Sequence, residues 1–428
     1  MPIDVLLGLQ WGDEGKGKVV DVFTPHYDIV ARFQGGPNAG HTIIFNQKKY
    51  VLHLVPSGIF HEGTTCIVGN GVVIDPVTLR REIETLEASG EYIRDRIVIS
   101  QRAHLILPTH KLLDAASEKA KGDQKIGSTL RGIGPTYMDK TGRNGLRIGD
   151  LLSPDFEQKY RALVEKHRGL LSHYDFEYDL AETEAQFLGS LDFIRSLKLD
   201  NTEHLLHRAL REGKTVLAEG AQGTLLDIEF GSYPFVTSSN TIAAGACTGL
   251  GVPPGQIGRV FGIFKAYATR VGSGPFPTEL DNEAGERLRE AGGEYGATTG
   301  RPRRCGWIDL PLLKYSILLN GVTDLIMTKA DVLSSVSEVK ACTAYRLPSG
   351  EETTEVPYDL ASAFEPVFRS FPGWEEDITG AREKEDLPRT LRNYIEALEA
   401  YLEVPVSFVS VGPDREQILH MREALRVR

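Results

Sequence analysis

Residues 8–18, GLQWGDEGKGK, bring together four glycines, two lysines and two acids. They follow an apolar run at residues 5–7, typical of a buried strand, and precede residues 19–23, which can continue as a helix. A glycine-rich turn between a strand and a helix presents main-chain N–H groups and the positive end of the helix dipole to an anion. The stretch therefore predicts a phosphate-binding loop, in which Lys16 and Lys18 place charges against phosphate oxygens.

This loop departs from the standard phosphate-binding pattern, which ends in Gly-Lys-Ser/Thr and uses the hydroxyl as a magnesium ligand. Here Lys16 is followed by Gly17, so the hydroxyl is missing, whereas Asp13 and Glu14 supply carboxylate oxygens that suit Mg²⁺. A nucleotide site of this kind must find its metal ligand inside the loop, and the same carboxylates are candidates for a base. The alternative is a glycine-rich turn that binds nothing.

A second loop predicts recognition of guanine. Thr328-Lys329-Ala330-Asp331 follows the apolar run at residues 325–327. A carboxylate only accepts hydrogen bonds, and guanine offers two adjacent donors, N1–H and the 2-amino group, which adenine lacks. Asp331 could equally be the N-cap of a helix. Residues 410–412, Ser-Val-Gly, follow another apolar run and are a candidate second wall for the base, although the same sequence is typical of a turn.

Three arginines lie within four residues at positions 301–304, between glycines. Guanidinium forks suit bidentate contacts with carboxylates or phosphates, so in an acidic protein this cluster predicts an anion site rather than a solvated basic loop.

Three further polar positions are weaker candidates. Gln222 is a polar amide between small residues that could orient a substrate, and Thr237 lies among hydroxyls suited to a monophosphate. His41 follows Asn38-Ala39-Gly40 and is a candidate general acid or phosphate contact. Turn chemistry or packing could explain each of them equally well.

The alternation of strand and helix patterns along the chain predicts how these loops are positioned. Strand patterns recur at residues 5–7, 27–33, 65–68, 96–99, 215–218, 260–264, 324–327 and 406–409, with a hairpin at 42–54 and helices at 75–90 and 110–121. We expect one α/β domain, residues 1–428, with a large, mainly parallel central sheet flanked by helices. Residues 121–150 are expected to form a long polar loop, and residues 151–211 a helical insertion.

Composition narrows the class of partner. The chain has 428 residues and a formal net charge of −11, which argues against a nucleic-acid partner. Its four cysteines lie far apart and its eleven histidines show no metal-binding spacing, as expected in a reducing compartment. We expect a cytoplasmic protein, because neither a leader pattern nor an apolar run long enough for a membrane is visible.

Taken together, the motifs resemble the adenylosuccinate synthetase family. The strings QWGDEGKGK, QGGPNAGHT, STLRGIGP, EGAQGTLLDI, YPFVTSSNT, KAYATRVGSGPFPTEL, GATTGRPRRCGW and TKAD occur in the family's order and cover nearly the whole chain. Where the family often has TKLD and STG, this chain has TKAD and SVG, so Ala330 and Val411 can contribute only main-chain contacts.

The resemblance implies a GTP-dependent ligase that joins IMP to L-aspartate through 6-phosphoryl-IMP, giving adenylosuccinate, GDP and phosphate in the first committed step from IMP to AMP. It also implies one Mg²⁺ per subunit and a homodimer. Asp13 would be the base for the IMP N1 proton and, with the Gly40 carbonyl, a magnesium ligand. His41 would be the acid assisting phosphoryl transfer, and Lys16 and Gln222 complete the catalytic set.

By the same resemblance, GTP would contact Gly12, Asp13, Glu14, Gly15, Lys16, Gly17, Lys18, Gly40, His41, Thr42, Arg303, Lys329, Ala330, Asp331, Ser410, Val411 and Gly412. IMP would contact Asp13, Glu14, Gly15, Lys16, Asn38, Ala39, Gly40, His41, Thr129, Gln222, Thr237 and Arg301, and also Arg143 of the other subunit. Aspartate would contact Ala297, Thr298, Thr299, Gly300, Arg301, Pro302 and Arg303.

Two other functions compete with this one. A regulatory GTP-binding switch would share the phosphate and guanine loops, but it has no use for the arginine cluster or the loop at residues 127–135. A dinucleotide-binding oxidoreductase is disfavoured, because no G-x-G-x-x-G with a ribose-binding acid follows the first strand.

Overall fold

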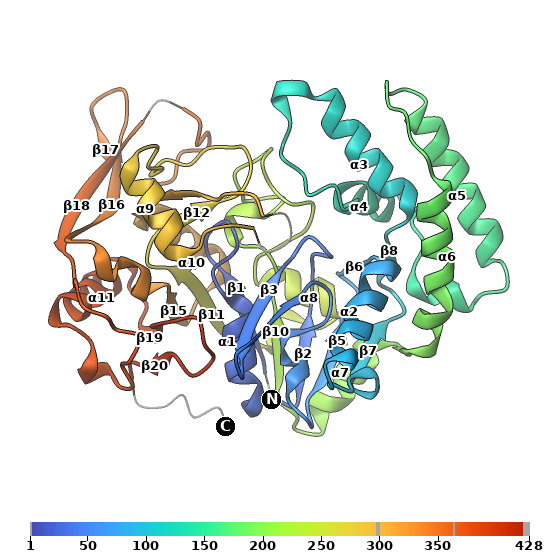
Figure 1. The fold of residues 1–428 in the computed structure, drawn as a ribbon, viewed down its shortest axis with the longest axis horizontal. Coiled ribbons are helices and arrows are strands. Elements are labelled where there is room, and N and C mark those ends of the chain that lie inside the picture. Colours follow the sequence, from blue (N-terminus) through green and yellow to red (C-terminus); the bar gives the residue numbers. More distant parts are fainter. Residues whose placement is uncertain (1, 297–299, 363, 423–428) are drawn as a thin grey trace.

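A computed structural model describes residues 2–296, 300–362 and 364–422. A ten-stranded sheet runs through the middle of the molecule (Figure 1), and every neighbouring pair is parallel except β19 with β20. The predicted mainly parallel sheet is therefore confirmed. In spatial order its strands are β20 (Ile418–His420), β19 (Val406–Ser410), β15 (Asp324–Thr328), β11 (Ile257–Lys265), β1 (Ile3–Gly8), β10 (Val216–Glu219), β2 (Ile29–Arg32), β5 (Thr65–Val68), β7 (Ile97–Ser100) and β9 (Lys198–Asp200).

Helices cover both faces of this sheet, because its central strands are apolar on both sides. In β1, Val5 and Leu7 point into one hydrophobic cluster while Leu6 points into the other. Asp75, where a helix was expected to begin, caps α2 by accepting a hydrogen bond from the Val77 N–H at 3.3 Å. The helices are α1 (Lys16–Phe23), α2 (Pro76–Ala88), α3 (Pro108–Ala120), α4 (Ile133–Thr141), α5 (Phe156–Leu171), α6 (Ala181–Ser196), α7 (Thr202–Arg211), α8 (Ala244–Leu250), α9 (Glu283–Gly292), α10 (Leu310–Asn320) and α11 (Arg389–Leu402).

Smaller sheets surround the central one. The predicted hairpin is confirmed, with Thr42 opposite Val51. The C-terminal half carries a further sheet that packs against α10, orange in Figure 1. These strands are β3 (His41–Phe45) with β4 (Lys48–Leu52), β6 (Val73–Ile74) with β8 (His104–Leu105), β12 (Ala268–Arg270) with β13 (Arg304–Gly306), and β14 (Ile308–Asp309), β16 (Glu338–Arg346), β17 (Glu352–Thr353) and β18 (Glu365–Pro372).

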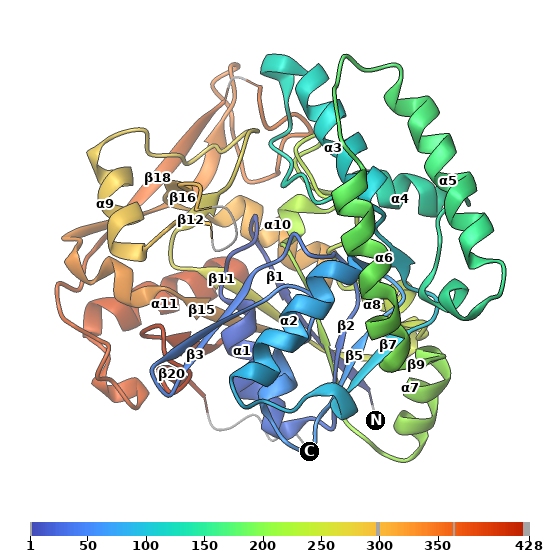
Figure 2. The same cartoon turned by 45° about the vertical axis from the view of Figure 1, so that its right-hand side comes forward.

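The structure corrects the expectation of a long loop at residues 121–150, because α4 lies within it. Gly132 begins this helix with φ of 76°, and Ile133 and Thr136 are buried. Only two turns long and punctuated by glycine, α4 gives too little periodicity to be recognised from sequence. Residues 151–211 were expected to be a helical insertion, and most of them form α5, α6 and α7, but β9 within this range pairs with β7 at the sheet edge. Figure 2 shows α5 and α6 outside α3 and α4. The limits of the insertion stay a prediction.

The fold brings the predicted loops to one edge of the sheet. The strands β1, β10, β2, β11, β15 and β19 are mutually parallel, so the loops that follow them all emerge at their carboxyl ends, where open α/β sheets bind ligands. Within the described ranges, no helix combines the length and apolar character that crossing a bilayer requires. The four cysteines are free thiols.

Candidate active site

The phosphate loop lies between β1 and α1, as its sequence predicts. Gly15 is the N-cap of α1 with φ of 89°, a left-handed conformation that favours glycine. A Cβ on Gly17 would lie 2.7 Å from the Cβ of His41, so the loop and the hairpin can approach only because residue 17 is glycine. The N-terminus of α1 and its unpaired N–H groups therefore face the hairpin that carries His41.

The two acids of the loop have different roles. The Glu14 side chain is fully buried, and its carboxylate accepts hydrogen bonds from the Gly12 N–H at 2.8 Å and the Gln10 N–H at 3.2 Å. It also pairs with the Lys16 ammonium group. Glu14 therefore stabilises the conformation of the phosphate loop through buried contacts, and its own carboxylate is not available to a ligand. Of the two carboxylates considered for magnesium, that of Asp13 is the one exposed to the cavity, with 32% of the side chain accessible.

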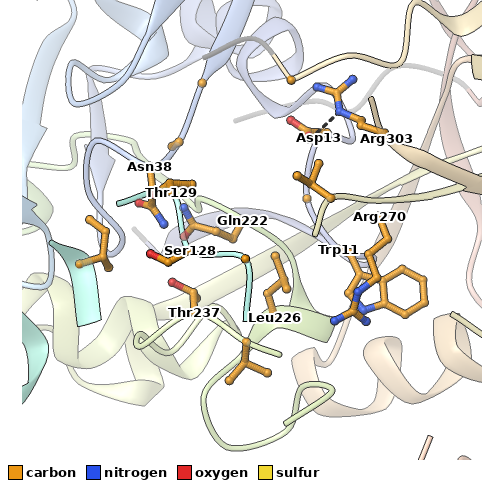
Figure 3. Close-up of a pocket in the computed structure, with 18 of the residues that line it drawn as sticks. Trp11, Asp13, Asn38, Ser128, Thr129, Gln222, Leu226, Thr237, Arg270 and Arg303 are labelled. Carbon is orange, nitrogen blue, oxygen red and sulfur yellow. Dashed lines mark hydrogen bonds and ion pairs between the residues drawn. The ribbon is translucent and has the colours of Figure 1, made fainter. Parts of the chain in front are cut away.

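Asp13 meets the arginine loop across this cavity. Its Oδ2 accepts a hydrogen bond from Arg303 Nε at 2.8 Å (Figure 3). Burial alone would lower the pKa of the Arg303 guanidinium, but the carboxylates of Asp13 and Glu294 outweigh it and raise that pKa. Arg304, the next residue in the chain, binds Glu279 instead, with its Nε 2.7 Å from Glu279 Oε1. The arginine cluster is thus divided between the Asp13 side and a separate ion pair.

His41 is oriented by a buried carboxylate. Its Nδ1 lies 2.6 Å from Glu219 Oε1, and Glu219 also accepts the Ser57 hydroxyl at 2.7 Å and the Ser57 N–H at 2.8 Å. Burial lowers the pKa of His41, opposed by its bond to Glu219, and the pKa of Glu219 is lowered because the bond from His41 and nearby positive charge outweigh burial. Both shifts favour a neutral imidazole with the proton on Nδ1 beside a carboxylate. His41 Nε2 is buried and has no hydrogen-bond partner among the described residues.

A second polar group gathers around Gln222 (Figure 3). Gln34 Nε2 donates to the Ala221 carbonyl at 2.8 Å and to Gln222 Oε1 at 3.3 Å, which fixes which way the Gln222 amide points. Gln222 Nε2 and Asn38 Oδ1 are then buried without partners in the part of the chain that the structure describes. Such atoms lose free energy unless something bonds to them, so they mark a place for a polar ligand.

The loop that carries Thr129 is attached to α3. Ser128 donates to Asp114 at 2.7 Å, and the Gly127 N–H donates to Glu118 at 2.9 Å. These bonds hold Thr129 at the rim of the cavity, where it is exposed. In Figure 3 the neighbouring Ser128 lies between Thr129 and Thr237, which comes from another loop.

The predicted guanine end is assembled from three segments. Lys18 donates to Ser410 Oγ at 2.9 Å and to the Gly412 carbonyl at 2.7 Å, so its ammonium group holds the C-terminal loop rather than facing outward. Asp331 lies inside a short 3-10 helix, Ala330–Ser335, whose N-cap is Lys329. The N-cap alternative for Asp331 is therefore wrong, and its half-buried carboxyl group lines the cavity, where burial raises its pKa.

One cavity of about 1290 Å³ joins these parts. Most ligand pockets have volumes of about 300–1,000 Å³, so this one has room for more than one ligand. The predicted site residues that line it are Gly12, Asp13, Glu14, Gly15, Lys16, Gly17, Lys18, Asn38, Ala39, Gly40, His41, Thr42, Thr129, Gln222, Thr237, Arg303, Lys329, Asp331, Ser410 and Gly412.

The other predicted residues lie elsewhere. Ala330 and Val411 are buried in the main hydrophobic cluster, consistent with main-chain contacts alone. Exposed positions outside the cavity lining are Arg143, Gly300, Arg301 and Pro302. Arg301 Nη1 reaches the Gly127 carbonyl at 3.4 Å and so joins the arginine loop to the Thr129 loop. Ala297, Thr298 and Thr299 lie outside the described residues.

Sequence reasoning missed several residues of the site. Arg270 lines the cavity with its guanidinium 5.2 Å from the Trp11 ring, and Gln34 and Glu219 orient the predicted side chains. The one available signal was their position, since Gln34 follows β2 and Glu219 ends β10, both apolar strands whose carboxyl ends face the site.

A cluster of His110, Asp139 and His167 also lines or adjoins the cavity, with its ligand atoms within 4.8 Å of one another. His110 Nδ1 accepts the Leu107 N–H at 2.9 Å, so its Nε2 carries the proton and donates to Asp139 Oδ2 at 3.1 Å. Lys166 Nζ binds the other oxygen at 2.5 Å. These hydrogen bonds hold α3, α4 and α5 together. Because His110 Nε2 carries a proton, it has no lone pair with which to bind a metal.

Comparisons with known proteins agree over nearly the whole chain. A sequence model of the adenylosuccinate synthetase family matches residues 5–419. The chain is 59% identical over 422 residues to the adenylosuccinate synthetase of Christiangramia forsetii, covering 98% of this chain and 100% of that one, and 59% identical over 419 residues to that of Parabacteroides distasonis, covering 98% and 99%.

Solved structures are similar as well. The fully ligated adenylosuccinate synthetase of Plasmodium falciparum superposes with a TM-score of 0.93 at 40% identity, covering 99% of this chain and 100% of that one. A succinoaminodeoxyadenylate synthetase of cyanophage S-2L, solved with dGMP and dATP, has a TM-score of 0.64 at 19% identity over 98% and 95% of the two chains, a likeness of fold alone.

Proposed function

The chain belongs to the adenylosuccinate synthetase family, and we propose that it joins IMP to L-aspartate, with hydrolysis of GTP, in the cavity around Asp13. It is a GTP-dependent ligase of AMP biosynthesis. The observation that carries the site assignment is the position of Asp13. Its carboxylate lines one continuous cavity that extends from Asp331 to Gln222 and Thr237.

GTP lies at the first end of this cavity. Asp331 accepts hydrogen bonds from the guanine N1–H and 2-amino group, and the loop at Ser410 covers the base, held there by Lys18. The phosphates bind the N–H groups at the start of α1, with the Lys16 ammonium group as the charged partner. Adenine has neither of these donors, so ATP would leave the half-buried Asp331 carboxylate without a hydrogen-bond partner, which is the physical basis for excluding ATP.

IMP lies at the other end. Thr129 and Thr237 bind its 5′-phosphate, and the unpartnered amide of Gln222 meets the 6-oxygen. Asp13 accepts the N1 proton, so that electron density moves to the 6-oxygen, which attacks the γ-phosphorus of GTP. The bond to GDP breaks and 6-phosphoryl-IMP forms. His41 takes up a second proton at Nε2 when the anionic phosphates bind, with Glu219 as its counter-charge, and the Nε2–H then donates to the transferring phosphoryl group.

Aspartate completes the reaction from the arginine loop. Arg303, and Arg301 beside it, bind its carboxylates, and its amine attacks C6 and displaces inorganic phosphate. The products are adenylosuccinate, GDP and phosphate. Arg303 already contacts Asp13 at 2.8 Å, so the aspartate site borders the base.

Two hard oxygen donors would hold Mg²⁺ here, the carboxylate of Asp13 and the carbonyl of Gly40, and both residues line the cavity. When bound, the ion supplies positive charge against the phosphate oxygens of GTP. We propose one ion per subunit.

We further propose a cytoplasmic homodimer in which Arg143 binds the IMP phosphate of the partner subunit. Arg143 is exposed two residues after the end of α4, with φ of 61°, and Met138 on α4 is 72% exposed. An exposed apolar side chain near an exposed arginine fits a surface that a second copy buries.

A product assay tests the proposal. Purified chain with GTP, Mg²⁺, IMP and aspartate is expected to form the succinylated purine, followed by its absorbance, and Asp13→Ala is expected to abolish turnover while GTP still binds. Phosphate release from GTP that ignores IMP and aspartate would instead identify a GTP-binding switch. Substantial turnover by Asp13→Ala would refute the assigned base.

The shared site has its own test. Mixing the inactive variants Arg143→Leu and Asp13→Ala is expected to restore part of the activity through hybrid dimers, each with one intact site. No recovery at any mixing ratio would count against the exchange of Arg143 between subunits.

A further inference from the structure

Glu294 is a completely buried carboxylate that the proposed reaction does not use. It lies just after α9, at the base of the loop that ends with Arg303, and its side chain has an exposed fraction of 0%. Its oxygens accept hydrogen bonds from Tyr267 Oη at 2.5 Å, from Lys265 Nζ at 2.9 Å to each oxygen, and from Arg303 Nη1 at 2.6 Å. Its carbonyl also accepts the Arg303 N–H at 2.9 Å.

These contacts form a row of alternating charges that ends at the phosphate loop. Lys265 binds Glu294, Glu294 binds Arg303, and Arg303 Nε binds Asp13 Oδ2 at 2.8 Å. Lys265 is buried as completely as Glu294 and gives its third hydrogen bond to Thr269 at 2.7 Å. A buried carboxylate persists as an ion only with compensating partners, and here two cations supply them. Charge from Lys265 and Arg303 accordingly lowers the pKa of Glu294 to about 2 against the effect of burial.

The row fixes the plane of one particular guanidinium group. Arginine carries five N–H donors in a rigid planar fork, so two hydrogen bonds to different carboxylates define the orientation of the whole group. Arg303 donates from Nη1 to Glu294 and from Nε to Asp13, and the residue lines the cavity. The neighbouring Arg304 has no such arrangement, because it pairs with Glu279 away from Asp13.

We propose that Glu294, backed by Lys265, is a positioning residue that presents Arg303 to the carboxylate of the substrate aspartate. The inference rests on the proposed function and specifies the recognition of its third substrate. Arg303 would otherwise be free to adopt many rotamers, and substrate binding would have to order it. Because the pair holds it in one orientation before aspartate arrives, aspartate binds an ordered site. Arg303 is one of many predicted GTP contacts and is not among the predicted IMP contacts, so the binding of GTP and IMP depends less on Glu294 than the binding of aspartate does.

A purely structural role is the competing explanation, since Glu294→Gln leaves Lys265 buried without a counter-charge and destabilises the fold for that reason alone. The double variant Lys265→Met/Glu294→Gln separates the two explanations. It removes both members of the buried pair together, so no unpaired charge remains, but Arg303 still loses its charged partner. Glu279→Gln is the matched control, because it removes the carboxylate partner of the adjacent arginine.

The experiment measures KM for each substrate, kcat and the melting temperature in the product assay. We expect the double variant to melt close to the parent chain, with a KM for aspartate raised about 10- to 100-fold, the loss typical of one charge-assisted hydrogen bond. The KM values for GTP and IMP should change less than about threefold, and kcat less than the KM for aspartate. Glu279→Gln should leave the KM for aspartate within about threefold.

Two results would overturn the inference. One is a double variant whose KM for aspartate matches that of the parent chain. The other is a Glu279→Gln variant that raises this KM as much as the double variant does, since the effect would then not be specific to Arg303. Failure of the parent chain to form adenylosuccinate would instead reject the proposed function, so the two failures are distinguishable.

Discussion

The pair formed by His41 and Glu219 supports the most specific prediction about catalysis. Glu219→Gln keeps the size of the side chain and an oxygen that can accept the His41 Nδ1–H bond of 2.6 Å, but it removes the negative charge. Positive charge that develops on the imidazole during phosphoryl transfer then loses its counter-charge. We expect kcat to fall while the binding of GTP and IMP is nearly unchanged.

The magnitude follows from the burial and the distance. Opposite unit charges about 4 Å apart attract by roughly 4 kcal/mol at an effective dielectric constant of about 20. Glu219 is fully buried, so solvent screens little of this energy. The amide dipole and the imidazole hydrogen bond recover part of it, and about 2–3 kcal/mol remains as the loss. At about 1.4 kcal/mol per factor of ten, kcat should fall roughly 30- to 150-fold.

The assay is steady-state formation of the succinylated purine, with each substrate varied in turn. Ser57→Ala is the control, because it removes the hydroxyl bond of 2.7 Å to Glu219 but keeps the carboxylate charge and the Ser57 N–H. We expect this control to change kcat less than about threefold. A Glu219→Gln variant that keeps more than half of the parent kcat, or that loses no more than Ser57→Ala, would refute the role assigned to the charge.

Three further changes have defined outcomes. Gln34→Glu replaces the Nε2 donor, 3.3 Å from Gln222 Oε1, by a second acceptor. In the product assay kcat should fall about 10- to 100-fold with little change in the KM for GTP. An unchanged kcat would contradict the proposed orientation of the Gln222 amide. Asp331→Asn should shift preference from GTP toward xanthosine triphosphate about 10- to 100-fold in kcat/KM, and unchanged selectivity would mean that Asp331 does not contact the base. Burial lowers the pKa of Lys18 from 10.5 to about 8. As the pH rises, the folded chain therefore loses this proton before the unfolded chain does. Between pH 8 and pH 10.5 this difference raises the free energy of unfolding by up to about 3 kcal/mol. Lys18→Met should remove that increment from urea-unfolding curves at pH 7.5 and 10.5, and an identical pH dependence would argue against the buried ammonium group.

The sequence predicted the parts of the site that depend on short stretches of chain. The phosphate loop needs a left-handed turn before α1, and Gly15 reveals it locally. The parallel sheet follows from apolar runs that alternate with helices, and its carboxyl edge from the positions of Asp13, Asp331 and Ser410 after such runs. The helix α4 was missed because two turns interrupted by glycine carry little periodicity.

What side chains do inside the loops could not be predicted, because it depends on residues far away in the chain. The sequence alone does not distinguish the roles of the adjacent acids Asp13 and Glu14. In the structure Asp13 faces the cavity, whereas Glu14 is buried with its carboxylate 2.8 Å from the Gly12 N–H. Glu219, the partner of His41, lies 178 residues away from it in the chain. Asp13, a partner of Arg303, lies 290 residues away from that arginine. Pairings of this kind come from strand order, which no local pattern records.

The two buried carboxylates, Glu219 and Glu294, express one physical requirement of the site. A cavity that must hold three anionic substrates needs cationic and proton-donating groups, and those groups repel one another or relax into other contacts unless something holds them. Glu219 anchors His41, and Glu294 anchors Arg303, each from a fully buried position behind the cavity wall. Burial keeps solvent from screening them, so each fixes its partner before a ligand arrives. Of the loop carboxylates, Asp13 alone remains partly exposed. Its proposed role requires this exposure, because a base must reach the proton that it accepts from the substrate.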